Sequence, residues 1–143
     1  MDFSTAVADD LDLYVQTPGG AIIWYGEDFD PITNGTLDKD KIPDKPGTYT
    51  ENTIFPNGPA GNYTVYVYQE ALMGSRDPFI FQIFDDSISS FDDSISSTAL
   101  YTYDGSGGLG ASESTPCFYY TRPGGGISES AGPCPEFPGV ARQ

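Results

Sequence analysis

The sequence contains no histidine and only six lysine and arginine residues, against 21 aspartate and glutamate residues, so its net charge is −15. Without histidine the chain can form neither a Ser-His-Asp or Cys-His catalytic arrangement nor a histidine-ligated zinc site. A surface with so few cations repels phosphate backbones, so we expect no binding to nucleic acid. The metal chemistry that is left relies on carboxylate oxygens, which favours calcium.

Long apolar runs are also missing. No stretch of 18 consecutive apolar residues occurs, so we expect no insertion into a membrane. The first seven residues, Met1 to Val7, lack the basic start and apolar stretch of a signal peptide. Secretion therefore has to be argued from other features of the chain.

Three features favour an extracellular or cell-surface location. Only two cysteines are present, Cys117 and Cys134, and a bond between them would stabilise the fold by about 3 kcal/mol. Two Asn-x-Thr tripeptides, beginning at Asn34 and Asn62, are acceptor sites for N-glycosylation. Together with the acidity of the chain, a disulfide and glycans are typical of secreted proteins.

Helical periodicity is nearly absent, and glycine and proline separate short segments with strand character. An aromatic content of 14% argues for a packed core instead of disorder. The segments with strand patterns are Leu11–Val15, Ala21–Tyr25, Thr48–Thr50, Tyr63–Gln69, Phe79–Phe84, Leu100–Tyr103 and Cys117–Thr121. They predict an all-β fold, an antiparallel β-sandwich of jelly-roll or immunoglobulin-like type with about seven to eight strands.

The 143 residues are the length of one domain. We expect a single β-sandwich domain over residues 1–143, with residues 1–8 as an N-terminal arm and residues 135–143 as a C-terminal arm. The Pro- and Gly-rich stretch between the two cysteines predicts a C-terminal loop closed by the disulfide.

One strand pattern carries apolar bulk on both faces. Tyr63, Val65 and Val67 share one face, and Tyr66 and Tyr68 lie on the other. A strand that is apolar on both faces is expected near the centre of a sheet. Its tyrosine face then has to be covered by a loop, a neighbouring subunit or a ligand.

The unit Phe-Asp-Asp-Ser-Ile-Ser-Ser occurs twice in succession, at residues 84–90 and 91–97. Its apolar residues fall at helical spacing, but aspartate and serine are mediocre helix formers and the duplication itself imposes the period. We therefore expect a turn-and-strand unit or a serine-rich surface loop. The paired aspartates, Asp85 and Asp86 in the first copy, are either solvated turns or weak calcium ligands.

Two acidic motifs, Asp10-Leu-Asp12 and Asp38-Lys-Asp40, are the main candidates for metal binding. Asp10 and Asp12 share one face of a predicted strand with Cα atoms about 6.6 Å apart, so both carboxylates can reach one calcium ion. The alternative is that they solvate an outer strand face. The second motif does not continue as an EF-hand, and its interleaved lysines can neutralise the aspartates in surface ion pairs.

Several blocks occur in an order found in known modules: Ala8-Asp-Asp-Leu-Asp-Leu-Tyr-Val, Thr17-Pro-Gly-Gly, Ile23-Trp-Tyr-Gly, Gly35-Thr-Leu-Asp-Lys-Asp, Pro59-Ala-Gly-Asn-Tyr-Thr-Val-Tyr-Val and Asp77-Pro-Phe-Ile-Phe-Gln-Ile. Over about residues 8–84 the chain resembles the calcium-binding β-sandwich modules of bacterial secreted and surface proteins, the pre-peptidase C-terminal-like domains. The resemblance implies a non-catalytic, calcium-stabilised sandwich. Its implied calcium ligands are Asp10, Asp12, Asp38 and Asp40. Asn34 departs from the family pattern, which usually has glycine there, and a glycan on it would crowd such an ion site.

These features favour a non-catalytic, secreted structural or adhesive module, stabilised by calcium and glycosylated. Apolar bulk on both faces of residues 63–68 and an arm at each end favour association with copies of itself in an extracellular fibre or surface layer. The alternative is a carbohydrate-binding or targeting module of a larger secreted enzyme, in which Trp24, Tyr66 and Tyr68 stack on a glycan. No carboxylate pair has a context that singles it out for glycoside hydrolysis, so we expect no enzymatic activity.

Overall fold

A computed structural model of the protein describes residues 2–5, 11–37, 47–50, 52–69, 76, 78–85 and 99–135. In this part of the chain all regular structure is β, the strands pair antiparallel and no helix occurs. The same residues therefore include no helix long and apolar enough to cross a membrane. The prediction of an all-β, antiparallel fold is confirmed.

The larger sheet is built around a central nine-residue strand, β8 (Gly61–Gln69). The spatial order is β13 (Ile127–Pro133), β12 (Pro116–Arg122), β8, β2 (Leu11–Gln16) and β3 (Ile22–Ile23), and the short β11 (Glu113–Ser114) also pairs with β8. Val65 at the middle of β8 lies opposite Val15 on one neighbour and Phe118 on the other. The strand with apolar residues on both faces is thus central, as expected.

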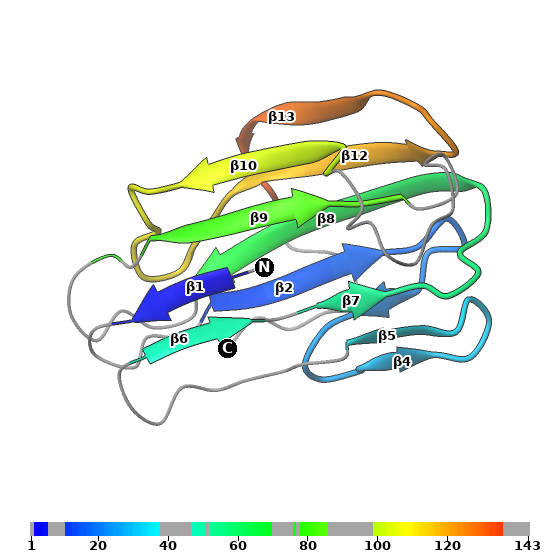
Figure 1. The fold of residues 1–143 in the computed structure, drawn as a ribbon, viewed down its shortest axis with the longest axis horizontal. Coiled ribbons are helices and arrows are strands. Elements are labelled where there is room, and N and C mark those ends of the chain that lie inside the picture. Colours follow the sequence, from blue (N-terminus) through cyan, green and yellow to red (C-terminus); the bar gives the residue numbers. More distant parts are fainter. Residues whose placement is uncertain are drawn as a thin grey trace, which may run out of the picture.

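The other described strands form two smaller sheets (Figure 1). One has the order β10 (Tyr101–Gly105), β9 (Phe79–Ile83), β1 (Asp2–Thr5) and β6 (Gly47–Thr50), and the other has the order β4 (Phe29–Asp30), β5 (Gly35–Leu37) and β7 (Thr53–Ile54). The arm expected over residues 1–8 includes β1, which is paired on both edges within the same chain. Residues 136–143, most of the other predicted arm, lie outside the described residues.

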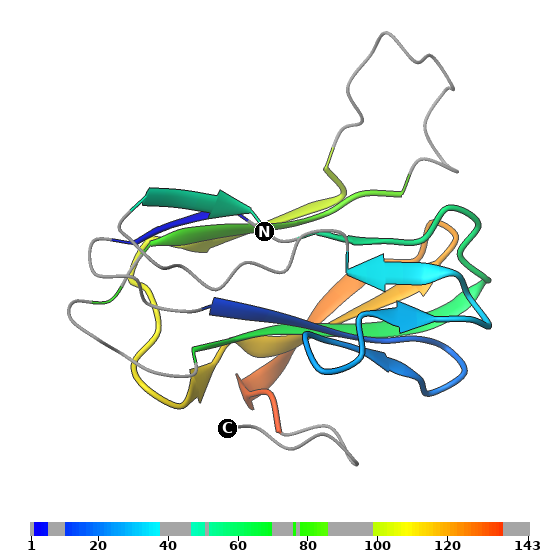
Figure 2. The ribbon, with the colours of Figure 1, turned by 90° about the horizontal axis from the view of Figure 1, so that it is seen from below.

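An apolar core lies between the larger sheet and the β10-β9-β1-β6 sheet, which form two layers in Figure 2. Phe81 of β9 stacks on Phe118 of β12 with ring centroids 5.0 Å apart, so the core joins the layers directly. The buried members of this core are Leu11, Leu13, Val15, Tyr63, Val65, Val67, Phe79, Phe81, Leu109 and Phe118. Side chains at alternate positions of β2 and β8 face it, as the period of a strand requires.

All seven predicted strand segments contain an observed strand, but the described residues contain 13 strands. The strands without a predicted counterpart are mostly short: β4, β7 and β11 have two residues each, and β5 has three. So few residues leave no alternating pattern in a sequence. Their pairing depends on neighbours supplied by the fold.

The disulfide closes a β-hairpin, where the sequence predicted a loop. Cys117 lies on β12 and Cys134 directly follows β13, with Cα atoms 4.6 Å apart, so the predicted bond between them is confirmed. β13 pairs along β12 while most of its side chains stay exposed. Such a strand needs no apolar pattern, which is why its glycine, serine and proline content resembles that of a loop. Gly124, with φ of 68°, sits in the turn between the two strands.

We expect the disulfide to contribute strongly to stability. Cys117→Ser/Cys134→Ser should lower the free energy of unfolding by about 3 kcal/mol, because the bond between residues 17 apart restricts the unfolded chain. Urea unfolding of the oxidised wild type and of the double variant measures this difference. A reductant should shift the wild-type midpoint and leave the variant unchanged. Equal midpoints for both proteins would contradict the expectation.

Candidate functional site

Of the four predicted calcium ligands, Asp12 lies within the described residues and Asp10, Asp38 and Asp40 lie outside them. Asp12 is on β2 opposite Tyr68 of β8, and only 3% of its surface is exposed. It therefore does not solvate an outer strand face. In the described ranges no three cysteine or acidic residues form a group that could hold a metal ion. The calcium site stays a prediction.

Asp30 belongs to the acidic region around the second motif, and its carboxylate organises a local turn. Its Oδ2 accepts hydrogen bonds from the Thr33 hydroxyl at 2.6 Å and the Thr33 backbone N–H at 3.2 Å, and its Oδ1 accepts one from the Ile32 N–H at 3.3 Å. The Thr33 hydroxyl, helped by the two backbone bonds, holds the pKa of Asp30 below its ordinary value although burial acts in the opposite direction. This carboxylate is used inside the turn.

Both predicted glycosylation sites are at the surface. Asn34 is exposed at the end of the Asp30 turn, with φ of 57°. Asn62 is exposed on β8, and its side-chain oxygen accepts a hydrogen bond of 2.6 Å from the Thr121 hydroxyl. Their exposure is compatible with glycan attachment, which stays a prediction at both positions.

The tyrosine face of β8 is buried. Tyr66 and Tyr68 are both almost wholly inaccessible, and Tyr66 stacks on Tyr14 of β2 with ring centroids 4.7 Å apart. The half-buried Trp24 lies on the other side of Tyr14, at 5.9 Å between centroids, and the disulfide packs against the same rings. Two of the three rings predicted to stack on a glycan are therefore out of reach of a ligand.

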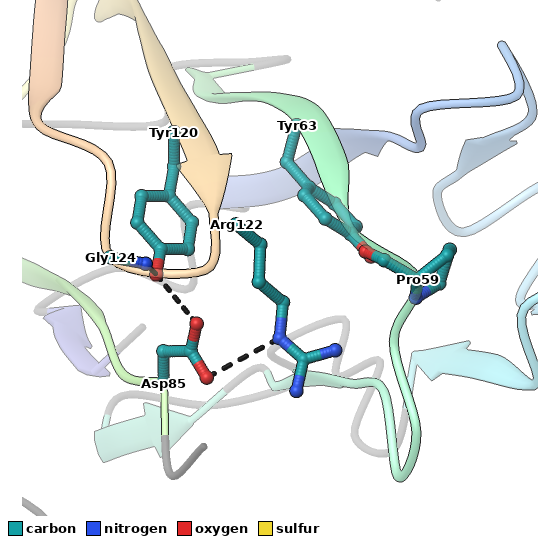
Figure 3. Close-up of polar contacts among 6 residues, drawn as sticks. All are labelled: Pro59, Tyr63, Asp85, Tyr120, Arg122 and Gly124. Carbon is teal, nitrogen blue, oxygen red and sulfur yellow. Dashed lines mark hydrogen bonds and ion pairs between the residues drawn. The ribbon is translucent and has the colours of Figure 1, made fainter. Parts of the chain in front are cut away.

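Most of the predicted repeat lies outside the described residues, but its first two residues are placed. Asp85, just after β9, is buried between the layers, in contrast to the solvated turn or weak calcium site expected for it. Figure 3 shows it beside two side chains of β12. Its Oδ2 accepts a hydrogen bond of 2.5 Å from the Tyr120 hydroxyl, and its Oδ1 lies 3.3 Å from Nε of Arg122.

Asp85, Tyr120 and Arg122 form a cluster that joins the two layers, which we call the polar tie. Tyr120 and Arg122 are two residues apart on β12 and so share one face of the larger sheet, while Asp85 lies two residues after the end of β9 in the facing sheet. The Tyr120 hydroxyl also accepts a hydrogen bond of 3.1 Å from the Gly124 N–H, which fixes the hairpin turn. A buried carboxylate with two such partners is compensated for its loss of water.

The pKa values of two tyrosines are raised: Tyr120 in the polar tie and Tyr63, which lines the same cavity. Burial raises the pKa of Tyr120, and its hydrogen bond to Asp85 adds to the effect. Burial also raises the pKa of Tyr63, whose hydroxyl donates a hydrogen bond of 2.8 Å to the Pro59 carbonyl oxygen. Both hydroxyls therefore act as hydrogen-bond donors near neutral pH, and neither is poised to act as a general base.

A cavity of about 810 Å³ opens next to the polar tie, between the layers. Its lining combines Leu13, Val15, Tyr63 and Val65 of the larger sheet with residues 52–58 and residues 80–85, and it includes all three residues of the polar tie. The lining is mainly apolar. A volume of this size is in the range of small-molecule and peptide sites.

Sequence reasoning missed this cavity. The residues that line it come from β2, β8, β9, β12 and the segment 52–58, which are far apart in the chain. The sequence signals were Arg122, one of few cations in an acidic chain, and Asp85 beside the apolar Phe84. Neither signal points to a partner until the strands are placed.

No known protein family matches this chain, and no curated protein or solved structure matches it either. The resemblance to pre-peptidase C-terminal-like modules therefore stays a prediction from the motifs of residues 8–84. What the chain does has to be argued from its own contacts.

Tyr120 should make the protein less stable at alkaline pH. Its folded pKa is raised above the ordinary 10.0, so the unfolded chain releases the phenolic proton first. The stability it contributes is therefore complete below about pH 10 and is lost as the pH rises through the folded value. Tyr120→Phe should flatten this alkaline loss and should cost about 1–2 kcal/mol at neutral pH through the lost hydrogen bond to Asp85.

Urea unfolding over a series of pH values from neutral to strongly alkaline measures both effects. Tyr119→Phe is the matched control. Tyr119 is next to Tyr120 on β12, but its ring is exposed on the opposite face of the strand. The control should behave as the wild type. If Tyr120→Phe showed the same alkaline loss as the wild type, the assignment to Tyr120 would be wrong.

Proposed function

We propose that this protein is a non-catalytic, secreted structural or adhesive module that is stabilised by calcium, is glycosylated and associates with copies of itself in an extracellular fibre or surface layer. The observation that carries the proposal is that its clustered polar and aromatic side chains are buried in contacts within the fold. The polar tie joins the two layers, and the Tyr14, Tyr66 and Tyr68 rings are buried beside the disulfide. Carboxylate and tyrosine side chains, which form binding or catalytic sites in other proteins, stabilise the fold here.

The extracellular location is supported by the disulfide. Such bonds persist in oxidising compartments and are rare in reducing ones. This bond ties the outermost hairpin of the larger sheet to itself, where it reinforces an edge of the domain. The exposure of Asn34 and Asn62 supports glycosylation in the same environment.

Calcium binding is supported by the position of Asp12. Its carboxylate is buried on the face of β2 that carries Tyr14, at the end of the strand nearest to Asp10 in the sequence. Asp10 is two residues before it in the sequence, the spacing at which two carboxylates on one strand face can reach one calcium ion.

Self-association is supported by the sheet edges. β13 and β3 bound the larger sheet, and β10 and β6 bound the facing sheet; their outer edges pair with no other strand in the described residues. Edge strands offer backbone donors and acceptors to another chain. The charge of −15 makes copies repel each other, so association should strengthen as salt screens it.

The alternative, a carbohydrate-binding or targeting module, is less well supported. Of its three expected stacking rings, Tyr66 and Tyr68 are buried and Trp24 is half-buried against Tyr14. A glycan would have to use other surfaces of the domain.

Calcium should raise the thermal stability of the protein. At a hundredfold excess over its dissociation constant one ion adds about 2.7 kcal/mol, or several degrees in the melting temperature. Asp12→Asn/Asp38→Asn should abolish the calcium-dependent shift. The exposed pair Asp28→Asn/Glu129→Gln changes the charge equally and should keep it. Melting curves with calcium and with a chelator decide this, and a wild type indifferent to calcium would remove the ion from the proposal.

The protein should form species larger than its 15.4 kDa monomer. Light scattering after size exclusion, at rising protein concentration and with low or moderate salt, measures the mass in each condition. We expect the mean mass to rise with concentration and with salt, because screening weakens the repulsion between acidic copies. A single 15.4 kDa species in all conditions, with and without calcium, would refute the self-assembly.

A further inference from the structure

The dipeptide Asn-Gly occurs twice in the sequence, at Asn34-Gly35 and at Asn57-Gly58. In this dipeptide the glycine backbone nitrogen can attack the side-chain carbonyl carbon of the asparagine, because glycine has no Cβ to obstruct the approach. The attack requires a glycine N–H that is not held in a hydrogen bond and a backbone that can rotate. The two copies therefore differ in reactivity only through the fold.

The fold holds the first copy in place. Gly35 begins β5, which has a partner strand on each side, β4 and β7. The Gly35 N–H donates a hydrogen bond of 3.2 Å to the Thr33 hydroxyl oxygen. The glycine also packs tightly against the side chains of Phe55 and Ile23. Attack on Asn34 would have to break this hydrogen bond and rotate the backbone inside a paired, packed strand.

The second copy lies in the connection between β7 and β8. Asn57 is exposed there, in a turn, and neither Asn57 nor Gly58 belongs to a strand. Within the part of the chain that the structure describes, the Gly58 N–H makes no close hydrogen bond. Neither strand pairing nor a hydrogen bond to this N–H therefore opposes the rotation that brings the Gly58 nitrogen toward the Asn57 side chain.

The surroundings of Gly58 favour the reaction further. A Cβ at this position would lie 2.9 Å from the Tyr63 hydroxyl oxygen and 3.0 Å from the Phe55 Cβ, so the packing requires glycine here. The same point is 3.4 Å from Nη1 of Arg122, so the guanidinium lies close to Gly58. A nearby cation favours the deprotonated form of a group, and the deprotonated amide nitrogen is the nucleophile.

We propose that Asn57 is a site of spontaneous deamidation and that the fold protects Asn34 from the same reaction. The Gly58 nitrogen gives its proton to a base in the solvent and forms a bond to Cγ of Asn57. The bond from Cγ to the side-chain nitrogen breaks, and this nitrogen leaves as ammonia after taking up a proton. The product is a five-membered succinimide ring.

One water molecule then opens the ring in either of two ways. Cleavage between Cγ and the Gly58 nitrogen gives aspartate, and cleavage between the main-chain carbonyl carbon and the same nitrogen gives isoaspartate. Asn57 lines the cavity beside the polar tie, so either product adds a carboxylate to that lining. The proposal does not depend on the proposed structural role.

The test follows both positions in the folded full chain, produced without glycosylation so that no glycan shields Asn34. The protein is incubated at mildly alkaline pH and physiological temperature, and digested samples are sequenced by mass spectrometry over time. We expect Asn57 to convert at least about tenfold faster than Asn34, a ratio equivalent to the loss of one hydrogen bond. Both isoaspartate and aspartate should form, because the ring opens in both ways.

The control is the same chain unfolded in urea with a reductant. The two asparagines should then convert at similar rates, because each is followed by glycine and no fold distinguishes them. Thr33→Val removes the acceptor for the Gly35 N–H and should speed conversion of Asn34 while the rate at Asn57 stays the same. Thr64→Val, the same exchange on β8, should change neither rate. Circular dichroism shows whether each variant is folded.

Four results would overturn the proposal. The first is an intact Asn57 in the folded protein under conditions in which the unfolded chain reacts at both positions. The second is an equal rate at the two positions in the folded protein. The third is aspartate without isoaspartate at residue 57, which would mean direct hydrolysis of the amide without a ring. The fourth is an unchanged rate at Asn34 in Thr33→Val, which would refute protection by this hydrogen bond.

Discussion

The burial of β8 on both faces is the constraint on which the rest of the structure depends. Val65 and Val67 face the core beneath the β10-β9-β1-β6 sheet, while Tyr66 and Tyr68 lie among the rings on the other face. Each such side chain gains about 1.5–3 kcal/mol when it leaves water, so neither face can stay open. The second sheet covers one face. Tyr14, Trp24 and the disulfide-closed hairpin account for the packing on the other.

The polar tie and the cavity both follow from how the two layers meet. Asp85 reaches across from the end of β9 to Tyr120 and Arg122, so the layers are held together beyond the end of the β9 strand. β1 pairs with β9 only at Phe79 and Ile80, and residues 80–85 line the cavity. The polar tie therefore joins the layers at the end of β9 along which β1 does not pair.

The proposed structural role depends on sheet edges that pair with no other strand among the described residues. Open edges are an aggregation hazard, and a net charge of −15 is one way to keep copies apart until a specific contact forms. Association through these edges would then depend on ionic strength, which sets how strongly acidic copies repel each other. A dependence of association on ionic strength fits the proposed structural module.

The sequence by itself determined the all-β class, the central place of β8 and the disulfide, because each depends on local alternation or on the only cysteine pair in the chain. It did not show β13 as a strand, since an exposed edge strand needs no apolar pattern. The burial of Asp12 and Asp85 was decided by the tertiary structure alone, as was the cavity. The partners that cover these residues come from strands distant in the chain, and no local pattern of residues encodes that meeting.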